Sequence, residues 1–186
     1  MSDAETPPTV LAVDDEPDLA ELYRVYLDAA YEARIATSGE EALSMMDESV
    51  DVVLLDRRMP EMSGHEVLEA IRGEGYDARI AMLTAVEPDV DIVEMPFDDY
   101  KTKPVTREDL LGLVEVLLHR AEFDEHSQEF FALASKKAAL EATDTTDTDE
   151  YEELVDRMEA VRDRIDDTLD RLSARDAFAE IPGEAP

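Results

Sequence analysis

Hydrophobic and polar positions follow two different patterns along the chain. From residue 10 to about residue 120, short apolar runs alternate with segments of helical periodicity, which is typical of a parallel sheet wrapped by helices. Three of the runs, VLAV, VVLL and IAML, are almost continuously apolar, as expected of central strands that helices cover on both faces. The predicted strands are Val10–Val13, Ala33–Thr37, Asp51–Asp56, Arg79–Thr84 and Tyr100–Lys103.

The segments between these strands predict the helices of the crossovers. A first helix has Pro17 in its first turn, where proline is well tolerated. Further helices are expected over 40–48, 64–72 and 107–119. The fourth crossover, 87–99, contains Pro88 and Pro96, which leave room for only about two turns of helix. We therefore expect this crossover to be short or irregular.

The residues after 120 show helical periodicity alone. One predicted helix runs from about 121 to 141 and carries Phe123, Phe130, Phe131, Leu133, Ala134 and Leu140. A second runs from about 149 to 177, and its apolar stripe consists of Leu154, Met158, Val161, Ile165, Leu169 and Leu172. The polar segment TDTTDTDE between them favours a turn and a helix N-cap. The two helices are therefore expected to form an antiparallel hairpin.

Together these patterns predict an α/β fold with a helical extension. We expect a doubly wound, five-stranded parallel sheet of the flavodoxin-like order 2-1-3-4-5, followed by a C-terminal all-α hairpin. The expected domains are 9–120 and 121–178, with flexible tails at 1–8 and 179–186.

The charge of the chain excludes several classes of function. Its 186 residues include 17 Lys and Arg against 49 Asp and Glu, a formal net charge of −32. Residues 121–186 alone hold 7 basic and 20 acidic residues, a net −13, and a helix that reads DNA needs a basic face. The composition therefore argues against direct DNA binding. Because molar salt screens such self-repulsion, it also favours a salt-loving source.

The sequence lacks cysteine and lacks segments typical of secretion or membrane insertion, which limits the possible chemistry and cellular location of the protein. There is no cysteine, which excludes disulfides, thiolate metal sites and a cysteine nucleophile. The start, MSDAETPPT, has no secretion signal, and no uncharged apolar run approaches the roughly 20 residues that a bilayer requires. We expect a soluble, cytoplasmic protein.

Polar side chains gather at the carboxyl ends of the predicted strands, where ligands bind in open parallel sheets. Asp14 and Asp15 follow the first strand, and Asp56 ends the third. Thr84 and Lys103 end the fourth and fifth strands. In the order 2-1-3-4-5 the first and third strands are neighbours, so the three aspartates could converge. Such a cluster needs a cation, because each carboxylate raises the pKa of the others, and Mg²⁺ is a suitable hard ion.

These residues resemble the receiver domain of two-component response regulators. The resemblance covers roughly residues 9–120 and depends on VLAVDDE, VVLLDRRMPEMSG, MLTA and YKTKPV, which occur in order behind their strands. It implies a protein that accepts a phosphoryl group from a sensor histidine kinase and acts as a switch, not as a true enzyme.

The resemblance also implies a role for each site residue. Asp56 would be the phosphoacceptor, and Mg²⁺ would be held by Asp14, Asp15, Asp56 and the backbone carbonyl of Arg58. Thr84 would hydrogen-bond the phosphoryl group and Lys103 would pair with one of its oxygens. Tyr100 stands at the position of the family's aromatic switch residue, and the Lys103–Pro104 bond is often cis in the family. Family members vary at the positions of Arg58 and Val86, which influence phosphoryl lifetime, and the fourth helix is expected to be shortened.

The C-terminal segment resembles the HalX domain, which follows receivers in halophilic archaea and is often associated with transcriptional regulation. The resemblance implies an output domain that acts through an unidentified protein partner. The stripe on 154–172 is equally consistent with packing inside one chain and with a homodimer. A second class of function also fits the strand-end residues, namely a Mg²⁺-dependent phosphatase or phosphotransferase with an aspartate nucleophile. Such enzymes typically carry Asp-x-Asp-x-Thr after the first strand, whereas Asp14 is followed here by Asp-Glu-Pro.

Overall fold

The computed structural model describes residues 6–85, 94–143 and 146–179, with side chains described as far as residue 174. Its strands are β1 (Thr9–Val13), β2 (Glu32–Ala36), β3 (Val50–Asp56), β4 (Arg79–Thr84) and β5 (Asp99–Thr102). Its helices are α1 (Pro17–Leu27), α2 (Gly39–Met45), α3 (Gly64–Glu74), α4 (Arg107–Ala142) and α5 (Asp149–Ala179). The chain divides into two compact units, residues 1–118 and 119–186.

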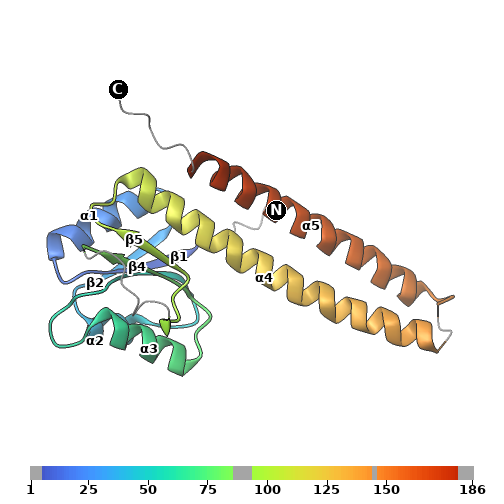
Figure 1. Cartoon of the computed structure of the whole chain (residues 1–186). Helices are drawn as coiled ribbons and strands as arrows, with labels where there is room; N and C mark the ends of the chain where they lie inside the picture. The colour runs from blue at the N-terminus through green and yellow to red at the C-terminus, as the bar shows by residue number, and fades with distance from the viewer. Residues whose placement is uncertain (1–5, 86–93, 144–145, 180–186) are drawn as a thin grey trace. The chain divides into compact units, whose positions relative to one another are not determined.

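The first unit is a five-stranded parallel sheet in the order β2-β1-β3-β4-β5, which confirms the predicted topology (Figure 1). The side chains of consecutive residues in the central strands point to opposite faces of the sheet and pack in two separate hydrophobic cores. Leu11 and Val53 pack with α2 and α3 on one face, while Val10 and Val52 pack with α1 and the first turns of α4 on the other. Both faces are buried, so the strands are continuously apolar.

Most of the predicted elements agree with the structure to within three residues at their ends. The prediction of separate helices over 107–119 and 121–141 is wrong, because the structure has one helix, α4, across both. The reason is local: no glycine or proline occurs between Gly112 and Thr143, so nothing in the sequence ends the helix at residue 120. The fourth crossover and its expected short helix lie largely outside the described residues, as does Val86.

The second unit contains the predicted antiparallel hairpin, formed by the C-terminal part of α4 and by α5. The Tyr151 hydroxyl donates to Glu141 at 2.8 Å, next to the turn. Farther along, the Arg157 guanidinium donates to Glu129 at 2.9 Å (Nε to Oε1). Among the described residues of the second unit, Leu133 of α4 is 4% exposed and Val161 of α5 is completely buried.

The predicted stripe on α5 is wrong at one position. Leu169 is 42% exposed, whereas Thr168 is only 2% exposed. Val161, Ile165 and Thr168 recur at the alternating four- and three-residue spacing of a helix seam, and Leu169 lies one position farther around the helix. The Thr168 hydroxyl donates to the Arg164 carbonyl at 2.8 Å, so its polar group is satisfied inside the seam.

Candidate functional site

The first carboxylate of the site is fixed by the turn that follows β1. Asp14 is completely buried, and its backbone N–H donates to the Ala36 carbonyl of β2 at 3.1 Å. Its Oδ1 accepts a hydrogen bond from the Glu16 N–H at 3.0 Å. This bond spans the turn into α1, which begins at Pro17. The side chain of Asp14 is therefore held at the carboxyl end of the sheet before any ligand binds.

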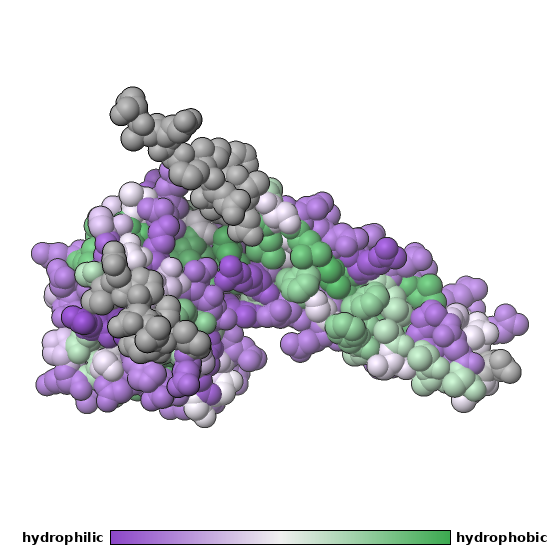
Figure 2. All heavy atoms as spheres, in the orientation of Figure 1, coloured by the Kyte–Doolittle hydropathy of each residue, from purple (hydrophilic) through white to green (hydrophobic). Residues whose placement is uncertain are grey.

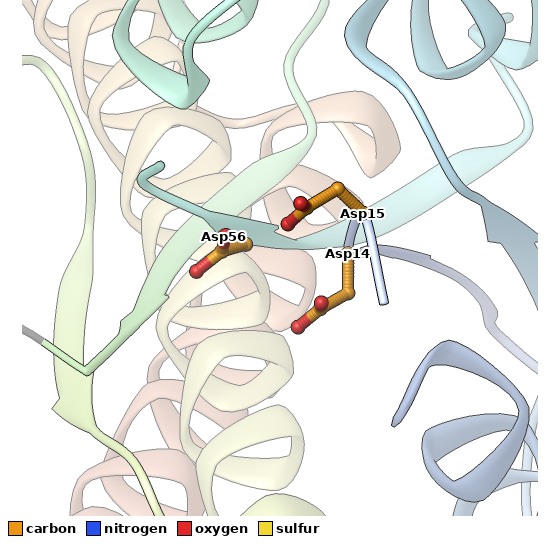
Figure 3. Close-up of side chains that lie close together, drawn as sticks. All are labelled: Asp14, Asp15 and Asp56. Atoms are coloured by element: carbon orange, nitrogen blue, oxygen red, sulfur yellow. The ribbon is translucent and has the colours of Figure 1, made fainter. Parts of the chain in front are cut away.

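The second carboxylate reaches the same place along β3. Asp56 is the last residue of β3 and is 6% exposed. Because β1 and β3 are adjacent and Val13 lies opposite Leu55, the residues after Val13 meet the end of β3. One oxygen from each of Asp14, Asp15 and Asp56 lies within 4.8 Å of the others. Figure 3 shows these three side chains, the aspartate trio, with their carboxylates turned toward a common space.

Lys103 supplies a positive charge beside the aspartate trio. It comes one residue after β5, and its N–H donates to the Thr84 carbonyl at 2.8 Å. Its Nζ lies 2.5 Å from Asp14 Oδ2 and 3.1 Å from Asp56 Oδ1. The Lys103–Pro104 peptide bond is cis. The prediction that Asp14, Asp15 and Asp56 converge is confirmed, and Lys103 from the end of β5 lies beside two of them.

Burial and the neighbouring opposite charges have opposing effects on the pKa values of Asp56 and Lys103. Burial raises the pKa of Asp56, whereas the charge and hydrogen bond of Lys103 lower it. The charges of Asp14 and Asp15 raise it further, so the net shift of the Asp56 pKa is upward. For Lys103, burial lowers the pKa, but the Asp14 hydrogen bond and the Asp56 charge outweigh it and leave the pKa above its ordinary value. Lys103 therefore stays protonated near neutral pH.

The donor set of the aspartate trio fits a divalent metal ion. Three ionised carboxylates with one lysine leave about two negative charges uncompensated in a largely buried site. Carboxylate oxygens are the ligands that Mg²⁺ prefers, and one or two of them with retained waters are its usual protein ligands. Asp15 is only partly buried, so the trio is open to solvent on one side. Both the charge and the oxygen donors suit Mg²⁺.

The two predicted switch residues lie on the neighbouring strands. Thr84 ends β4 and is 1% exposed. Tyr100 is half-buried on β5, where its ring lies 5.8 Å from that of Phe97 (centroid to centroid) and packs against the core that α2 and α3 cover. Tyr100 and Thr84 are thus on adjacent strands with Met82 opposite Tyr100 in the register. A role for the pair in switching remains a prediction.

The loop between β3 and α3 contains a constraint that the sequence analysis missed. The Gly64 N–H donates to the Arg57 carbonyl at 3.0 Å, and a Cβ on Gly64 would lie only 2.1 Å from the Asp56 carbonyl oxygen. Only glycine allows this approach. Ser63 caps α3 and forms a capping box with Glu66, whose Ser-x-x-Glu spacing is the signal that could have located the helix start. Arg58 lies in this loop with its side chain exposed.

The sequence model of the response regulator receiver domain matches residues 10–115. The chain belongs to the response regulators. The HalX domain matches residues 119–181, so a receiver followed by HalX, as the sequence resemblance implied, is confirmed.

Individual relatives of this response regulator agree with the assignment. It is 52% identical over 157 residues to a Haloferax volcanii protein named as a transcriptional regulator, covering 82% of this chain but only 27% of that relative. The Vibrio cholerae chemotaxis protein CheY4 is 31% identical with a TM-score of 0.56 over 60% of this chain and 99% of CheY4. Thermotoga maritima TrrA, solved with Mg²⁺ and BeF, is 35% identical with a TM-score of 0.50 over 59% of this chain and 97% of TrrA. Among the described residues, no helix combines the length and apolar character needed to cross a membrane.

A buried tyrosine beside the site gives a prediction of pH dependence. Tyr23 of α1 is 2% exposed, and its pKa is raised to about 12 by burial, with the Lys103 charge opposing and the Asp14 and Asp56 charges adding to the shift. Above pH ~10 the unfolded chain releases this proton while the folded chain keeps it, so stability falls by about 1.4 kcal/mol per pH unit from this group. Unfolding free energies measured across this range should fall less steeply for Tyr23→Phe than for the wild type. Equal slopes would show that Tyr23 ionises normally.

Proposed function

We propose that this response regulator is a phosphorylation-controlled switch with Asp56 as the phosphoacceptor. The observation that carries the proposal is the aspartate trio with the Lys103 ammonium within 3.1 Å of Asp56 Oδ1. An Asp56 oxygen would attack the phosphorus of a phosphohistidine on a sensor histidine kinase. The P–N bond would break as the P–O bond forms, and the leaving nitrogen would keep the electron pair. The imidazole ring, protonated on its other nitrogen, would depart as neutral histidine and leave an acyl phosphate on Asp56.

The residues of this chain would contribute mainly charge and position. Asp14 and Asp15, with the Asp56 side chain and the Arg58 carbonyl, would hold the metal ion. Bound Mg²⁺ supplies neutralisation of the phosphoryl oxygens. Lys103 would leave its contact with Asp56 to pair with one phosphoryl oxygen, since its Nζ already lies beside the acceptor. TrrA, which is solved with Mg²⁺ and BeF, supports this arrangement.

The output would start at Thr84 and Tyr100. The new acyl phosphate adds roughly −1.5 to −2 charge and several acceptors, and the Thr84 hydroxyl would move toward it as a donor. Tyr100 would then turn inward into the space that Thr84 leaves, which changes the surface formed by β4 and β5. We propose that receiver residues 9–120 control a HalX output domain over 121–178. This acidic domain would act in the cytoplasm through protein contacts, consistent with the transcriptional regulator among its relatives.

Incubation with acetyl phosphate and Mg²⁺ tests this function against the alternative of an aspartate-nucleophile phosphatase or phosphotransferase. A switch gains one phosphoryl group per chain, seen by intact-protein mass spectrometry, and releases inorganic phosphate only at the slow rate of its own dephosphorylation. Chelation of the metal should prevent the gain. Continuous release of phosphate, many equivalents per chain without an accumulated phosphoprotein, would instead establish the enzyme.

The acidic surface gives a prediction of salt dependence. With a net charge of −32, the folded chain repels itself unless counterions screen its surface. Raising KCl from about 0.1 M to about 3 M should raise the thermal midpoint by roughly 10 °C, because the Debye length falls to ~3 Å near molar salt. Circular dichroism at both concentrations measures the shift. Equal midpoints would contradict the expectation of a salt-adapted protein.

A further inference from the structure

Two aromatic rings meet at the amino-terminal end of β5. Phe97 lies two residues before β5, which begins at Asp99, and the centroid of its ring is 5.8 Å from that of Tyr100. Both side chains are partly buried against the core that α2 and α3 cover. On the face of the molecule shown in Figure 2, hydrophilic residues cover most of the first unit. A ring that left this core toward solvent would therefore lose apolar contact.

Phe97 and Thr84 lie on opposite sides of Tyr100 along the direction of the strands. Tyr100 is opposite Met82 in the parallel register of β4 and β5. Thr84 comes two residues after Met82, toward the carboxyl end of β4, and side chains two residues apart on a strand point to the same face of the sheet. Phe97 precedes β5 and lies toward its amino end. A Tyr100 ring that turns toward Thr84 therefore moves away from Phe97.

Arg72 fixes the backbone on both sides of Phe97. Its Nε donates to the Pro96 carbonyl at 3.0 Å, and its Nη2 donates to Asp98 Oδ2 at 2.8 Å. Its Nη1 donates to the Ala78 carbonyl at 2.7 Å. Arg72 is in the last turn of α3, so one planar side chain joins the end of α3 to both neighbours of Phe97.

Asp98 is also held by the start of β4. Its Oδ2 accepts a hydrogen bond from the Ile80 N–H at 2.8 Å, and its Oδ1 accepts one from the Arg79 guanidinium at 3.1 Å. The Asp98 N–H in turn donates to the Ile80 carbonyl at 2.8 Å. Because the Asp98 side chain is only 18% exposed, water competes little for these bonds. The backbone at Phe97 is thus tied to α3 and to β4, which keeps its ring in place when Tyr100 moves.

We propose that Phe97 is a positioning residue for Tyr100, a role that rests on the switch function proposed for this response regulator. Phe97 holds the Tyr100 ring in the orientation of this structure, the resting orientation, and Arg72 holds Phe97. An aromatic pair of this kind favours the resting orientation by roughly two- to tenfold. A ligand that binds better when Tyr100 is turned inward has to overcome that factor. Removing the Phe97 ring therefore makes such a ligand bind more tightly.

Beryllofluoride, an analogue of the phosphoryl group, tests the proposal with the full chain at saturating Mg²⁺ in molar KCl. Isothermal titration calorimetry should give a half-saturating concentration roughly two- to tenfold lower for Phe97→Ala than for the wild type. Phe97→Tyr keeps an aromatic ring and should match the wild type. So should the control Phe131→Ala, at an exposed position of the second unit. A half-saturating concentration for Phe97→Ala that equals or exceeds the wild-type value would overturn the proposal.

A double-mutant cycle separates positioning from a general loss of stability. In a Tyr100→Ala background, Phe97→Ala should leave the half-saturating concentration unchanged, because no ring remains to be positioned. Arg72→Lys keeps the charge but loses the fork that reaches two carbonyls. It should lower the half-saturating concentration, again only when Tyr100 is present. Shifts of the same size with and without the Tyr100 ring would show that the receiver has merely loosened, and they would overturn the proposal.

Nuclear magnetic resonance of the metal-free chain tests the contact without any ligand. Overhauser effects between the ring protons of Phe97 and Tyr100 are expected in the wild type, since the ring centroids are 5.8 Å apart. In Phe97→Ala, the Overhauser effect from the Tyr100 ring to the Thr84 methyl group should strengthen. An unchanged effect would overturn the role of Phe97, whatever Asp56 does. Failure of the wild type to bind beryllofluoride would instead count against the proposed switch function.

Discussion

Replacing Asp56 by asparagine is expected to reduce phosphoryl incorporation from acetyl phosphate at least about 100-fold, to the background of the assay. The amide at this position is a poor nucleophile, and it removes one of the three carboxylates of the aspartate trio. Intact-protein mass spectrometry of Asp56→Asn after incubation with acetyl phosphate and Mg²⁺ measures the effect.

The matched control for this change is Asp77→Asn, at an exposed position between α3 and β4. It should accept phosphoryl as the wild type does. Because burial and the charges of Asp14 and Asp15 disfavour ionised Asp56 in the folded state, Asp56→Asn should also be more stable than the wild type without metal. Full labelling of Asp56→Asn would show that another residue is the acceptor.

Replacing Gly64 by alanine is expected to destabilise the receiver unit by about 3 kcal/mol or more. The added Cβ would lie 2.1 Å from the Asp56 carbonyl oxygen and 2.9 Å from the Arg57 Cα. Backbone atoms cannot rotate away as a side chain can, so the loop that follows Asp56 must shift. Urea unfolding in high salt measures the loss of stability, and phosphoryl incorporation should fall with it.

A second glycine of α3 gives the control for Gly64→Ala. A Cβ on Gly73 would meet no atom within 4 Å, and Gly73 lies within α3. Gly73→Ala should therefore raise stability by roughly 0.5–1 kcal/mol, because alanine favours the helix and restricts the unfolded chain. If both variants changed stability equally, the close approach of Gly64 to Asp56 would not be a real constraint.

The sheet could be predicted because its strands are buried on both faces, and apolar runs such as VVLL have few alternatives. The predictions that were wrong, the end of the helix near residue 120 and one buried position on α5, depended on weaker sequence signals. The helix α4 continues through residue 120 because no helix-ending residue occurs there. The two separate apolar stripes in the sequence instead suggested two helices. Thr168 and Leu169 are adjacent on α5, and only the packing against α4 shows which of them is buried.

The site could be predicted in outline for a topological reason. Once β1 and β3 are neighbours, Asp14 and Asp56 must come close, since parallel strands end at the same edge of the sheet. Contacts that depend on backbone detail could not be predicted in the same way. The close approach of Gly64 to the Asp56 carbonyl and the burial of Tyr23 follow from the path of a loop and the tilt of a helix, which residue type alone does not determine.

The chemical identity of the phosphorylated residue tests the central claim most directly. Sodium borohydride reduces an acyl phosphate to an alcohol and releases phosphate, which converts a phosphorylated aspartate to homoserine. After treatment with acetyl phosphate and Mg²⁺, followed by borohydride and peptide mass spectrometry, the account predicts homoserine at position 56 alone. Homoserine at position 14 or 15, or a phosphoryl group that survives on a different type of side chain, would contradict it.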